Sequence, residues 1–423
     1  NQLPMTQFLP LRGLKYNLQK FDSLDELICP PFDLISSNLK NILENKNPYN
    51  AVWLEGTSQI KDGSENKYLD SKNTFNKWLN NEIIIRDEIP LYYLVKYRYM
   101  LNGTAYSVAK IIGMLQVEDL STGNIVGHEN TYPPIVEDRI KLLETTGVQF
   151  SPILAAFKDA SGTVKTIVNK TLREEAEAHI NITTTDSLDI WSISNNDDIQ
   201  SIKTALNDST VFIADGHHRY DAALGIQNSN TSTFESQHIM TALIDLDDPG
   251  LQILPYHRIM KNVNEELTAL VHCKLSEICI NHTQKNVEEI GSQSLLDLIS
   301  KTTQNIHTIC TLSPQKNILN IYNMDPQSSE DALGELAHSD AWILQSKVID
   351  SCMQKYPSSS LTYTHDLTEG IISKDSLAIF LGPFPKPAFE KVALSETNMP
   401  PKSTFFYPKM PTGLLFHPIY MGP

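Results

Sequence analysis

The chain has 423 residues, of which 41% are hydrophobic and 20% charged, and its formal net charge at pH 7 is −16. A chain of this length and composition forms two or three globular domains and excludes a disordered or fibrous protein. Its Lys and Arg residues are scattered, and an acidic chain without a basic stripe repels nucleic-acid phosphates, so we expect no nucleic-acid partner. No apolar run approaches the roughly 18 residues that cross a bilayer, and no signal-peptide pattern opens the sequence. We therefore expect no membrane partner and a cytoplasmic location.

The cysteines are odd in number and widely spaced, without a Cys-x-x-Cys pair: Cys29, Cys273, Cys279, Cys310 and Cys352. This usage predicts reduced, mostly buried thiols rather than a disulfide framework or a zinc site. It is typical of a protein in a reducing compartment.

The first predicted helix begins at Ser36 or Ser37, whose hydroxyl caps the amide groups of the first turn, and it runs to about Glu44. Residues 51–55 are predicted to form a short strand. Periodicity and turn residues then predict helices over 68–80, 137–146, 199–206 and 217–224, the last of them closed by Gly225. They predict strands over 91–99, 106–116, 153–157, 211–214, 239–246 and 377–381. Asn102-Gly103 predicts a tight hairpin between the strands 91–99 and 106–116. Gly147 is predicted to end the helix over 137–146.

The mixture of helices and strands predicts an α/β (α+β mixed) fold in three parts. These are an N-terminal α/β segment over residues 1–110, a core over 111–260 and a C-terminal α/β domain over 261–423 that closes the cleft. The limits rest on clusters of turn residues, because the sequence has neither an internal repeat nor a low-complexity linker.

The strongest candidate site follows the strand 211–214, where Asp215-Gly216-His217-His218-Arg219 opens a helix. Gly216 can take a positive φ and leaves room for a ligand, so amide groups and the helix dipole can face an anion. Arg219 is placed to fork onto phosphate oxygens, and the histidines add donors. Asp215 can orient a histidine, hold Mg²⁺ or assist proton transfer. The ordinary alternative is an N-capping aspartate, a turn glycine and surface histidines.

These residues belong to a set of motifs that resembles the DUF1015 family across nearly the whole chain. The motifs are Arg12-Gly13-Leu14, Pro30-Pro31-Phe32-Asp33, Asn47-Pro48-Tyr49-Asn50, His128-Glu129, Asp138-Arg139, Ser151-Pro152-Ile153, Asp215–Tyr220, Leu254-Pro255-Tyr256-His257-Arg258 and Met399–Lys409. The family carries no assigned function, so the resemblance implies membership and no activity.

A more distant resemblance to the ParB/sulfiredoxin-like superfamily implies an activity. In its free-serine-kinase branch, a His-Glu element precedes a helix and a later Asp-Gly-His-His-Arg, the order in which His128-Glu129 and Asp215–Arg219 occur here. The resemblance implies a ParB/sulfiredoxin-like nucleotide-binding core over 111–260, with ATP or ADP as phosphate donor and Mg²⁺. Glu129 would be the base that takes the proton from the substrate hydroxyl, and Asp215 would assist it or hold the metal. His218 would be catalytic and would hold phosphates together with Gly216, His217 and Arg219.

Further residues are assigned to the same cleft with open alternatives. Lys402 is a candidate for a phosphate or a carboxylate, although it and Lys409 can equally lie in water on a strand. Candidates for substrate binding are His128, Arg139, His257 and Arg258. Structural pairing of Arg139 and a solvated loop position for Glu129 are the competing interpretations.

The resemblance thus implies a phosphotransferase for a small, serine-like hydroxylated metabolite, with free L-serine as first substrate. The alternative is a ParB-like regulatory module that binds or hydrolyses nucleotide without converting a metabolite. A sulfiredoxin-type reductase is disfavoured, because its phosphate loop needs a Cys where His217 stands, and a nuclease is a third option. A homodimer is left open.

Overall fold

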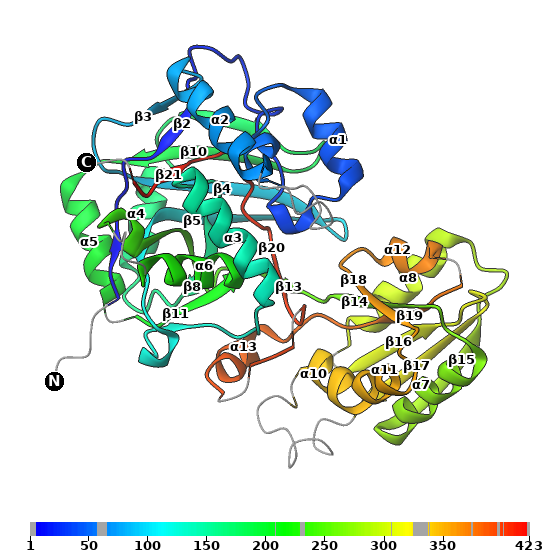
Figure 1. Cartoon of the computed structure of the whole chain (residues 1–423). Helices are drawn as coiled ribbons and strands as arrows, with labels where there is room; N and C mark the ends of the chain where they lie inside the picture. The colour runs from blue at the N-terminus through cyan, green and yellow to red at the C-terminus, as the bar shows by residue number, and fades with distance from the viewer. Residues whose placement is uncertain are drawn as a thin grey trace. The chain divides into compact units, whose positions relative to one another are not determined.

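The computed structural model describes residues 6–56, 66–207, 209–228, 233–305, 307–324, 337, 339–373, 375–395, 398–400 and 402–420. The described residues divide into two compact units (Figure 1): unit 1 takes its residues from 1–127, 131–251 and 408–423, and unit 2 from 128–130 and 252–407. The three-part division predicted above differs from this, because its limit at residue 110 falls inside strand β5 (Thr104–Gln116). The short segment 128–130 also joins the C-terminal unit instead of the predicted core.

Among the described residues of unit 1, nine strands form one mixed sheet in the order β6-β11-β8-β12-β5-β4-β10-β9, with β1 paired to β5. The strands are β1 (Phe8–Leu9), β4 (Tyr92–Leu101), β5, β6 (Ile125–Val126), β8 (Ile153–Phe157), β9 (Ala178–Asn181), β10 (Ser187–Ile193), β11 (Val211–Asp215) and β12 (His238–Asp245). Two short pairs stand apart from it, β2 (Leu14–Tyr16) with β3 (Ile84–Arg86) and β7 (Val148–Gln149) with β21 (His417–Pro418). Strand β8 is buried along its whole length between β11 and β12, and the candidate turn follows β11, which lies between β8 and the edge strand β6.

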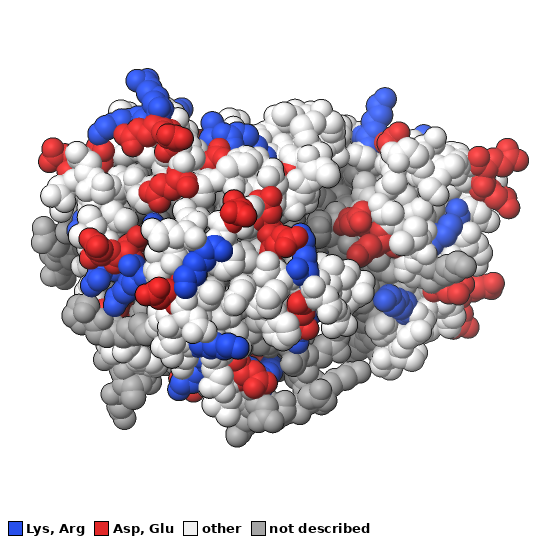
Figure 2. All heavy atoms as spheres, turned by 90° about the horizontal axis from the view of Figure 1, so that it is seen from above, with Lys and Arg blue, Asp and Glu red and all other residues white. Residues whose placement is uncertain are grey.

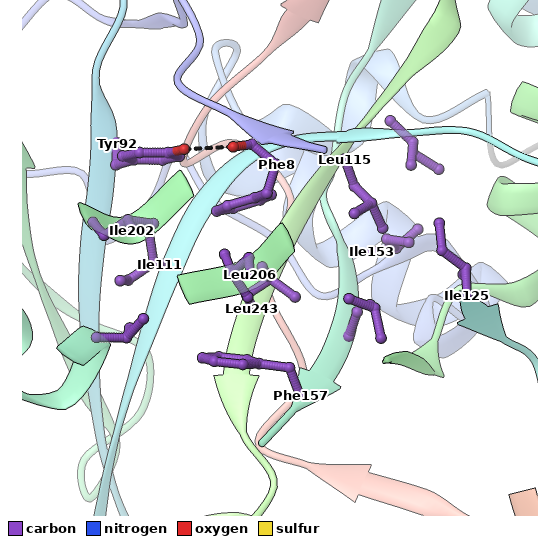
Figure 3. Packing of buried hydrophobic residues seen from close by; sticks show 14 of the residues in the cluster. Phe8, Tyr92, Ile111, Leu115, Ile125, Ile153, Phe157, Ile202, Leu206 and Leu243 are labelled. Atoms are coloured by element: carbon purple, nitrogen blue, oxygen red, sulfur yellow. Dashed lines mark hydrogen bonds between the residues drawn. The ribbon is translucent and has the colours of Figure 1, made fainter. Parts of the chain in front are cut away.

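The helices of unit 1 are α1 (Ser37–Lys46), α2 (Asn66–Asn80), α3 (Pro133–Thr146), α4 (Thr163–Thr171), α5 (Asn196–Asn207) and α6 (His217–Gln227). Helix α3 packs against both α2 and α6, and α4 packs against α5. The main core contains Ile167 of α4 and Ile202 of α5 together with inward-facing strand residues (Figure 3). Phe8 ties β1 to this core, because its carbonyl accepts a 2.6 Å hydrogen bond from the Tyr92 hydroxyl. Each fully buried side chain as large as Ile or Phe stabilises the fold by about 1.5–3 kcal/mol.

Local signals in unit 1 are confirmed where a backbone angle or a cap decides them. Asn102 and Gly103 have φ values of 50° and 77°, as the tight hairpin requires. The hydroxyl of Ser36 accepts from the Leu39 amide at the start of α1, and Gly147 has a φ of 70° at the end of α3.

Three predictions in unit 1 are wrong in detail. Residues 51–55 form no strand but the 3₁₀ turn η2 (Ala51–Leu54), because the side chain of Asn50 caps it through the Val52 amide. Gly225 lies inside α6 instead of ending it, at a point where an added Cβ would come within 3.1 Å of Ile140 on α3. The small residue therefore serves helix packing. The polar stretch before α5 also contains α4, β9 and β10, for which no element was predicted.

Among the described residues of unit 2, six strands form an antiparallel sheet in the order β15-β17-β16-β19-β14-β18. They are β14 (His257–Lys261), β15 (Cys279–Asn286), β16 (Thr308–Leu312), β17 (Ile318–Met324), β18 (Ser360–Thr364) and β19 (Leu377–Phe380), and β13 (Gln252–Leu254) pairs separately with β20 (Phe405–Tyr407). The helices are α7 (Glu265–Glu277), α8 (Ser292–Thr303), α10 (Asp340–Leu344), the π-helical turn η7 (Gln345–Ile349), α11 (Asp350–Lys355), α12 (Leu367–Ile372) and α13 (Lys386–Ala393).

The inner strands β16 and β19 of the sheet of unit 2 are buried on both faces, since successive residues of a strand point to opposite sides. Ile309 and Ile379 join a cluster with α7, α10 and α11, whereas their neighbours Cys310 and Phe380 join a second cluster with α8 and α12. The helices lie on the two sides of the sheet accordingly (Figure 1). This arrangement holds β14, and with it His257 and Arg258, in a rigid setting.

No helix in the described part of the chain is both long enough and apolar enough to span a membrane. On the face drawn in Figure 2, Lys and Arg side chains are interspersed with Asp and Glu. All five cysteines are free thiols, and Cys29, Cys310 and Cys352 are buried.

Candidate functional site

The turn after β11 has the backbone geometry that the sequence predicts. Gly216 has a φ of 98°, and a Cβ at this position would lie 2.6 Å from the Cγ2 atom of Ile153. Both the backbone conformation and the lack of space therefore exclude a side chain here. Helix α6 starts at the next residue. The first amide groups of an α-helix have no acceptor within the helix and carry its positive dipole end, which favours an anion.

Asp215 lies at the centre of a partly buried network of charges. Its Oδ1 is 2.6 Å from the Lys409 Nζ, and its Oδ2 is 3.0 Å from the Arg219 Nη2. Lys409, whose side chain is 6% exposed, also contacts the Asp33 Oδ2 at 2.6 Å. The two carboxylates and two cations balance one another, which explains how they are tolerated so far from water.

Arg219 joins this turn to the start of β8. Its Nη1 donates to the carbonyl of Pro152 at 2.6 Å and to the hydroxyl of Ser151 at 3.0 Å. Its Nε is buried and has no hydrogen-bond partner among the described residues. Two of the three guanidinium nitrogens are thus used inside the protein, which differs from the fork onto phosphate oxygens that the sequence suggests.

The two histidines have different surroundings. His217 is buried, and its ring packs against Gly127, where an added Cβ would lie 3.4 Å from the ring. The Nε2 of His218 accepts a 3.0 Å hydrogen bond from the Tyr132 amide, so His218 holds the segment that leads into α3. An accepting Nε2 carries no proton, and His218 is therefore neutral in this arrangement.

Arg139 is held by structural partners. Its Nη1 lies 3.3 Å from the Glu55 carboxylate, its Nε donates to the adjacent Asp138, and its guanidinium stacks 4.2 Å from the ring centre of Phe32. Burial raises the pKa of Asp138, but the charge of Arg139 and hydrogen bonds from Lys67 outweigh it and keep that pKa below its ordinary value. These contacts favour structural pairing over a direct contact with substrate.

A cavity of about 50 Å³ lies beside this cluster in unit 1. Arg139, Arg219 and Glu55 form its polar wall, and α3 and α6 contribute apolar side chains such as Leu142 and Ala222. A cavity of about 10–15 Å³ already admits one water, so this one holds a few waters or one small polar group but no nucleotide.

A second cavity in unit 1, of about 260 Å³, lies at the carboxyl ends of the parallel strands β8 and β12. Four aspartates face it against two lysines: Asp159, Asp245, Asp247, Asp248, Lys96 and Lys165. This excess of negative charge opposes the binding of nucleotide phosphates.

Lys110 on β5 is a buried base that the sequence did not single out. Its side chain is 0% exposed and its Nζ donates to the carbonyl of Pro408. Burial lowers the pKa of Lys110 to about 7, against the opposing charges of Asp215 and Asp248. An unfolded lysine has a pKa of about 10.4, so between these values the unfolded state binds the extra proton and stability rises with pH.

We therefore expect the Lys110→Met variant to lose part of this pH dependence. Between pH 7 and 9 the stability of the wild type should gain on that of the variant by up to about 1.4 kcal/mol per pH unit, or about 3–5 °C in melting temperature. Thermal melting at four pH values measures it, with Lys165→Met, at an exposed position on α4, as control. A difference between wild type and Lys110→Met that is constant with pH contradicts the burial of a neutral amine.

In unit 2, the carboxylate of Glu129 is fixed by residues near the C-terminus. Its Oε1 accepts from the amides of Ser403 and Thr404 at 3.1 and 3.0 Å and from the Thr404 hydroxyl at 3.1 Å. Its Oε2 accepts only one long bond among the described residues, 3.4 Å from the Lys402 amide. Glu129 is thus no freely solvated loop residue, and Oε2 is the oxygen that remains available for a substrate hydroxyl.

His128 completes this arrangement through Thr404. The His128 Nε2 lies 2.7 Å from the Thr404 Oγ1, and because that hydroxyl donates to Glu129, the imidazole must donate to it. The ring of His128 also packs edge-on against Phe389 and Phe406. The Met399 amide donates to the carbonyl of His128, so the segment 128–130 is held as a short extension of this part of unit 2.

The other predicted residues of unit 2 cluster around Tyr256. The Lys402 Nζ lies 5.1 Å from the centre of the Tyr256 ring and 3.5 Å from its hydroxyl. The Nδ1 of His257 accepts from the Leu381 amide, and burial, followed by the charge of Arg258, lowers the pKa of His257 to about 3. His257 is therefore neutral and structural, whereas the fully buried Arg258 has unusual contacts that are described below.

The predicted site residues thus fall into two clusters, one in each unit. Arg139, Asp215, Gly216, His217, His218 and Arg219 belong to unit 1, and His128, Glu129, His257, Arg258 and Lys402 belong to unit 2. Lys409, left undecided from the sequence, and Asp33 and Thr404, not singled out, complete them. All three lie in motifs that the family resemblance already contained, and that was the only signal for them.

The predicted role of Asp215 as a metal ligand finds no support. Each of its oxygens contacts a cation, and no group of three or more His, Cys, Asp or Glu in the described ranges could hold a metal ion.

Three solved structures illustrate the similarity of this chain to known folds. A conserved hypothetical protein from Pyrococcus furiosus is 12% identical with a TM-score of 0.36, over 72% of this chain and 93% of that one. A free serine kinase variant in complex with ADP is 11% identical with a TM-score of 0.36, over 70% and 87%. SbnI from Staphylococcus aureus, with a C-terminal truncation, is 12% identical with a TM-score of 0.37, over 70% and 82%. Sequence identities and TM-scores at this level place no constraint on the activity of this chain.

No curated protein sequence matches the chain. The model of a family described as a protein of unknown function, DUF1015, matches residues 8–339, which include most of the motifs that form the two clusters. The chain therefore belongs to the DUF1015 family.

Proposed function

We propose that the protein is a nucleotide-dependent phosphotransferase that acts on a small hydroxylated metabolite, with free L-serine as the first substrate to test. The observation that carries the proposal is the way in which Glu129 is held: three donors fix Oε1 and leave Oε2 for a substrate hydroxyl. A positioned carboxylate of this kind acts as a general base in phosphoryl transfer. The motif order shared with the free-serine kinases supports the same role.

The phosphate-binding part of the proposal rests on the turn after β11. The glycine at a φ of 98° and the first turn of α6 favour an anion, and His217 and His218 lie in that turn. In this proposal, ATP or ADP is the donor and brings Mg²⁺ with its phosphates. Arg139 and His257 act as positioning residues, and Lys402 contributes its backbone amide to Glu129 and its positive charge beside Tyr256.

A regulatory module that binds nucleotide without converting a metabolite is the second candidate. It is favoured by the internal pairing of Arg219 and Lys409, which leaves less positive charge for a transferring phosphoryl group. The two candidates differ in whether a product forms.

The test is direct. We expect the full chain, incubated with L-serine and either Mg-ATP or Mg-ADP, to form O-phosphoserine, detected by mass spectrometry and ³¹P NMR. A thermal-shift screen with the same nucleotides runs in parallel, because a ligand that binds the folded state alone raises the melting temperature. Nucleotide binding without product from serine or other hydroxylated metabolites would favour the regulatory module. The absence of both would reject the two candidates together.

A further inference from the structure

Arg258 is a buried cation whose hydrogen-bonding capacity is largely unused. It is the second residue of β14, and its side chain is 0% exposed. The Nη1 donates to the carbonyl of Tyr256, but Nε and Nη2 have no hydrogen-bond partner among the described residues. It is also the only arginine in the sequence of unit 2.

The two nitrogens without a hydrogen-bond partner have a geometry that suits one class of ligand. Nε and Nη2 lie on one edge of the planar guanidinium and direct two parallel N–H groups away from it. This edge matches the spacing of two oxygens of a carboxylate or a phosphate and binds them through two charge-assisted hydrogen bonds. Burial thus leaves vacant the edge that is best suited to an oxyanion.

The contacts within unit 2 do not replace such a partner. The guanidinium lies 5.3 Å from the ring centre of Tyr363, but an aromatic ring offers the two N–H groups no oxygen acceptor. A buried donor without an acceptor destabilises the folded state, and it does so more strongly when it is charged. Burial lowers the pKa of Arg258 to about 10, so the group still carries its charge at neutral pH.

Two neighbours of Arg258 bear on ligand binding: the partly exposed Tyr363 and the charged Glu129. The ring of Tyr363 that covers the guanidinium is itself 37% exposed, so Arg258 lies one side chain away from solvent. The negative charge of Glu129 also acts on Arg258 and opposes the lowering of its pKa. A small molecule held by Arg258 therefore lies within electrostatic reach of the carboxylate whose Oε2 is available.

We propose that the Nε/Nη2 edge of Arg258 binds the oxyanion group, a carboxylate or a phosphate, of a small ligand. This inference rests on the proposed function insofar as that ligand is the acceptor, whose charged group Arg258 then holds while its hydroxyl faces Glu129. The binding itself needs neither nucleotide nor turnover.

The test measures the melting temperature of the full chain against L-serine, ethanolamine, sodium phosphate and sodium chloride at matched ionic strength. We expect L-serine or phosphate to raise it, and ethanolamine and chloride to leave it unchanged. A response to L-serine identifies a carboxylate site and a response to phosphate alone a phosphate site. No response to either overturns the proposal. A response without any phosphorylated product from serine or other hydroxylated metabolites keeps the binding site and rejects the kinase.

Two variants separate a binding site from a structural arginine. Arg258→Met removes the unsatisfied charge, so it should melt no lower than the wild type while losing the ligand response. Arg258→Lys keeps the charge but not the edge and should weaken binding at least about tenfold. Arg98→Met, at a 44% exposed side chain in unit 1, is the control. A wild-type response in Arg258→Lys, or in a folded Arg258→Met, contradicts the assignment.

Discussion

Replacing Glu129 by glutamine is expected to lower the rate of phosphoserine formation by about 10²–10⁴-fold, the usual contribution of a general base. The substitution is nearly isosteric, and the amide oxygen of glutamine can accept the bonds that Ser403 and Thr404 donate to Oε1. The change therefore falls on Oε2, where an amide nitrogen cannot take a proton. Nucleotide binding, measured by thermal shift, should be retained.

The matched control for this variant is Glu265→Gln, an exposed glutamate at the start of α7 in the same unit. It should leave both the rate and the melting temperature unchanged. If Glu129→Gln turns over serine at the wild-type rate, Glu129 is not the base. If it melts well below the wild type, its three hydrogen bonds serve the structure first, and the rate must then be compared at a temperature where both are folded.

Replacing Asp215 by asparagine is expected to destabilise the protein by on the order of 3 kcal/mol, because it leaves one carboxylate, that of Asp33, against the two cations Lys409 and Arg219. The melting temperature should fall by about 6–12 °C. The control is Asp198→Asn, whose partner Lys170 lies 2.7 Å away with a 56% exposed side chain. Solvent screens an exposed pair of this kind, so the control should shift the melting temperature much less.

A double-mutant cycle assigns the effect to the pair. The double variant Asp215→Asn/Lys409→Met should lose less stability than the sum of the two single variants. Each single variant leaves the charge of the other residue without its partner, whereas the double variant removes both charges. Additive effects would mean that the 2.6 Å contact between Asp215 and Lys409 contributes nothing.

The features that were predictable from sequence are those that a few neighbouring residues decide. Asn102-Gly103 imposes its own positive φ values, and Ser36 caps its own helix. The strand, glycine turn and helix around Gly216 are local in the same way. By contrast, the short apolar run at 51–55 fits a strand or a turn equally well, and the Asn50 cap decided it.

The sequence by itself determined which motifs carry charged and donor groups, and that the chain mixes helices with strands. Only the tertiary structure decided which motifs meet. Glu129 bonds to Thr404 across 275 positions, and Lys409 bonds to Asp33 across 376. Periodicity describes one element at a time, and the entropy of closing a long loop changes so slowly with its length that it selects no partner. Burial and charge balance in the folded units select it instead.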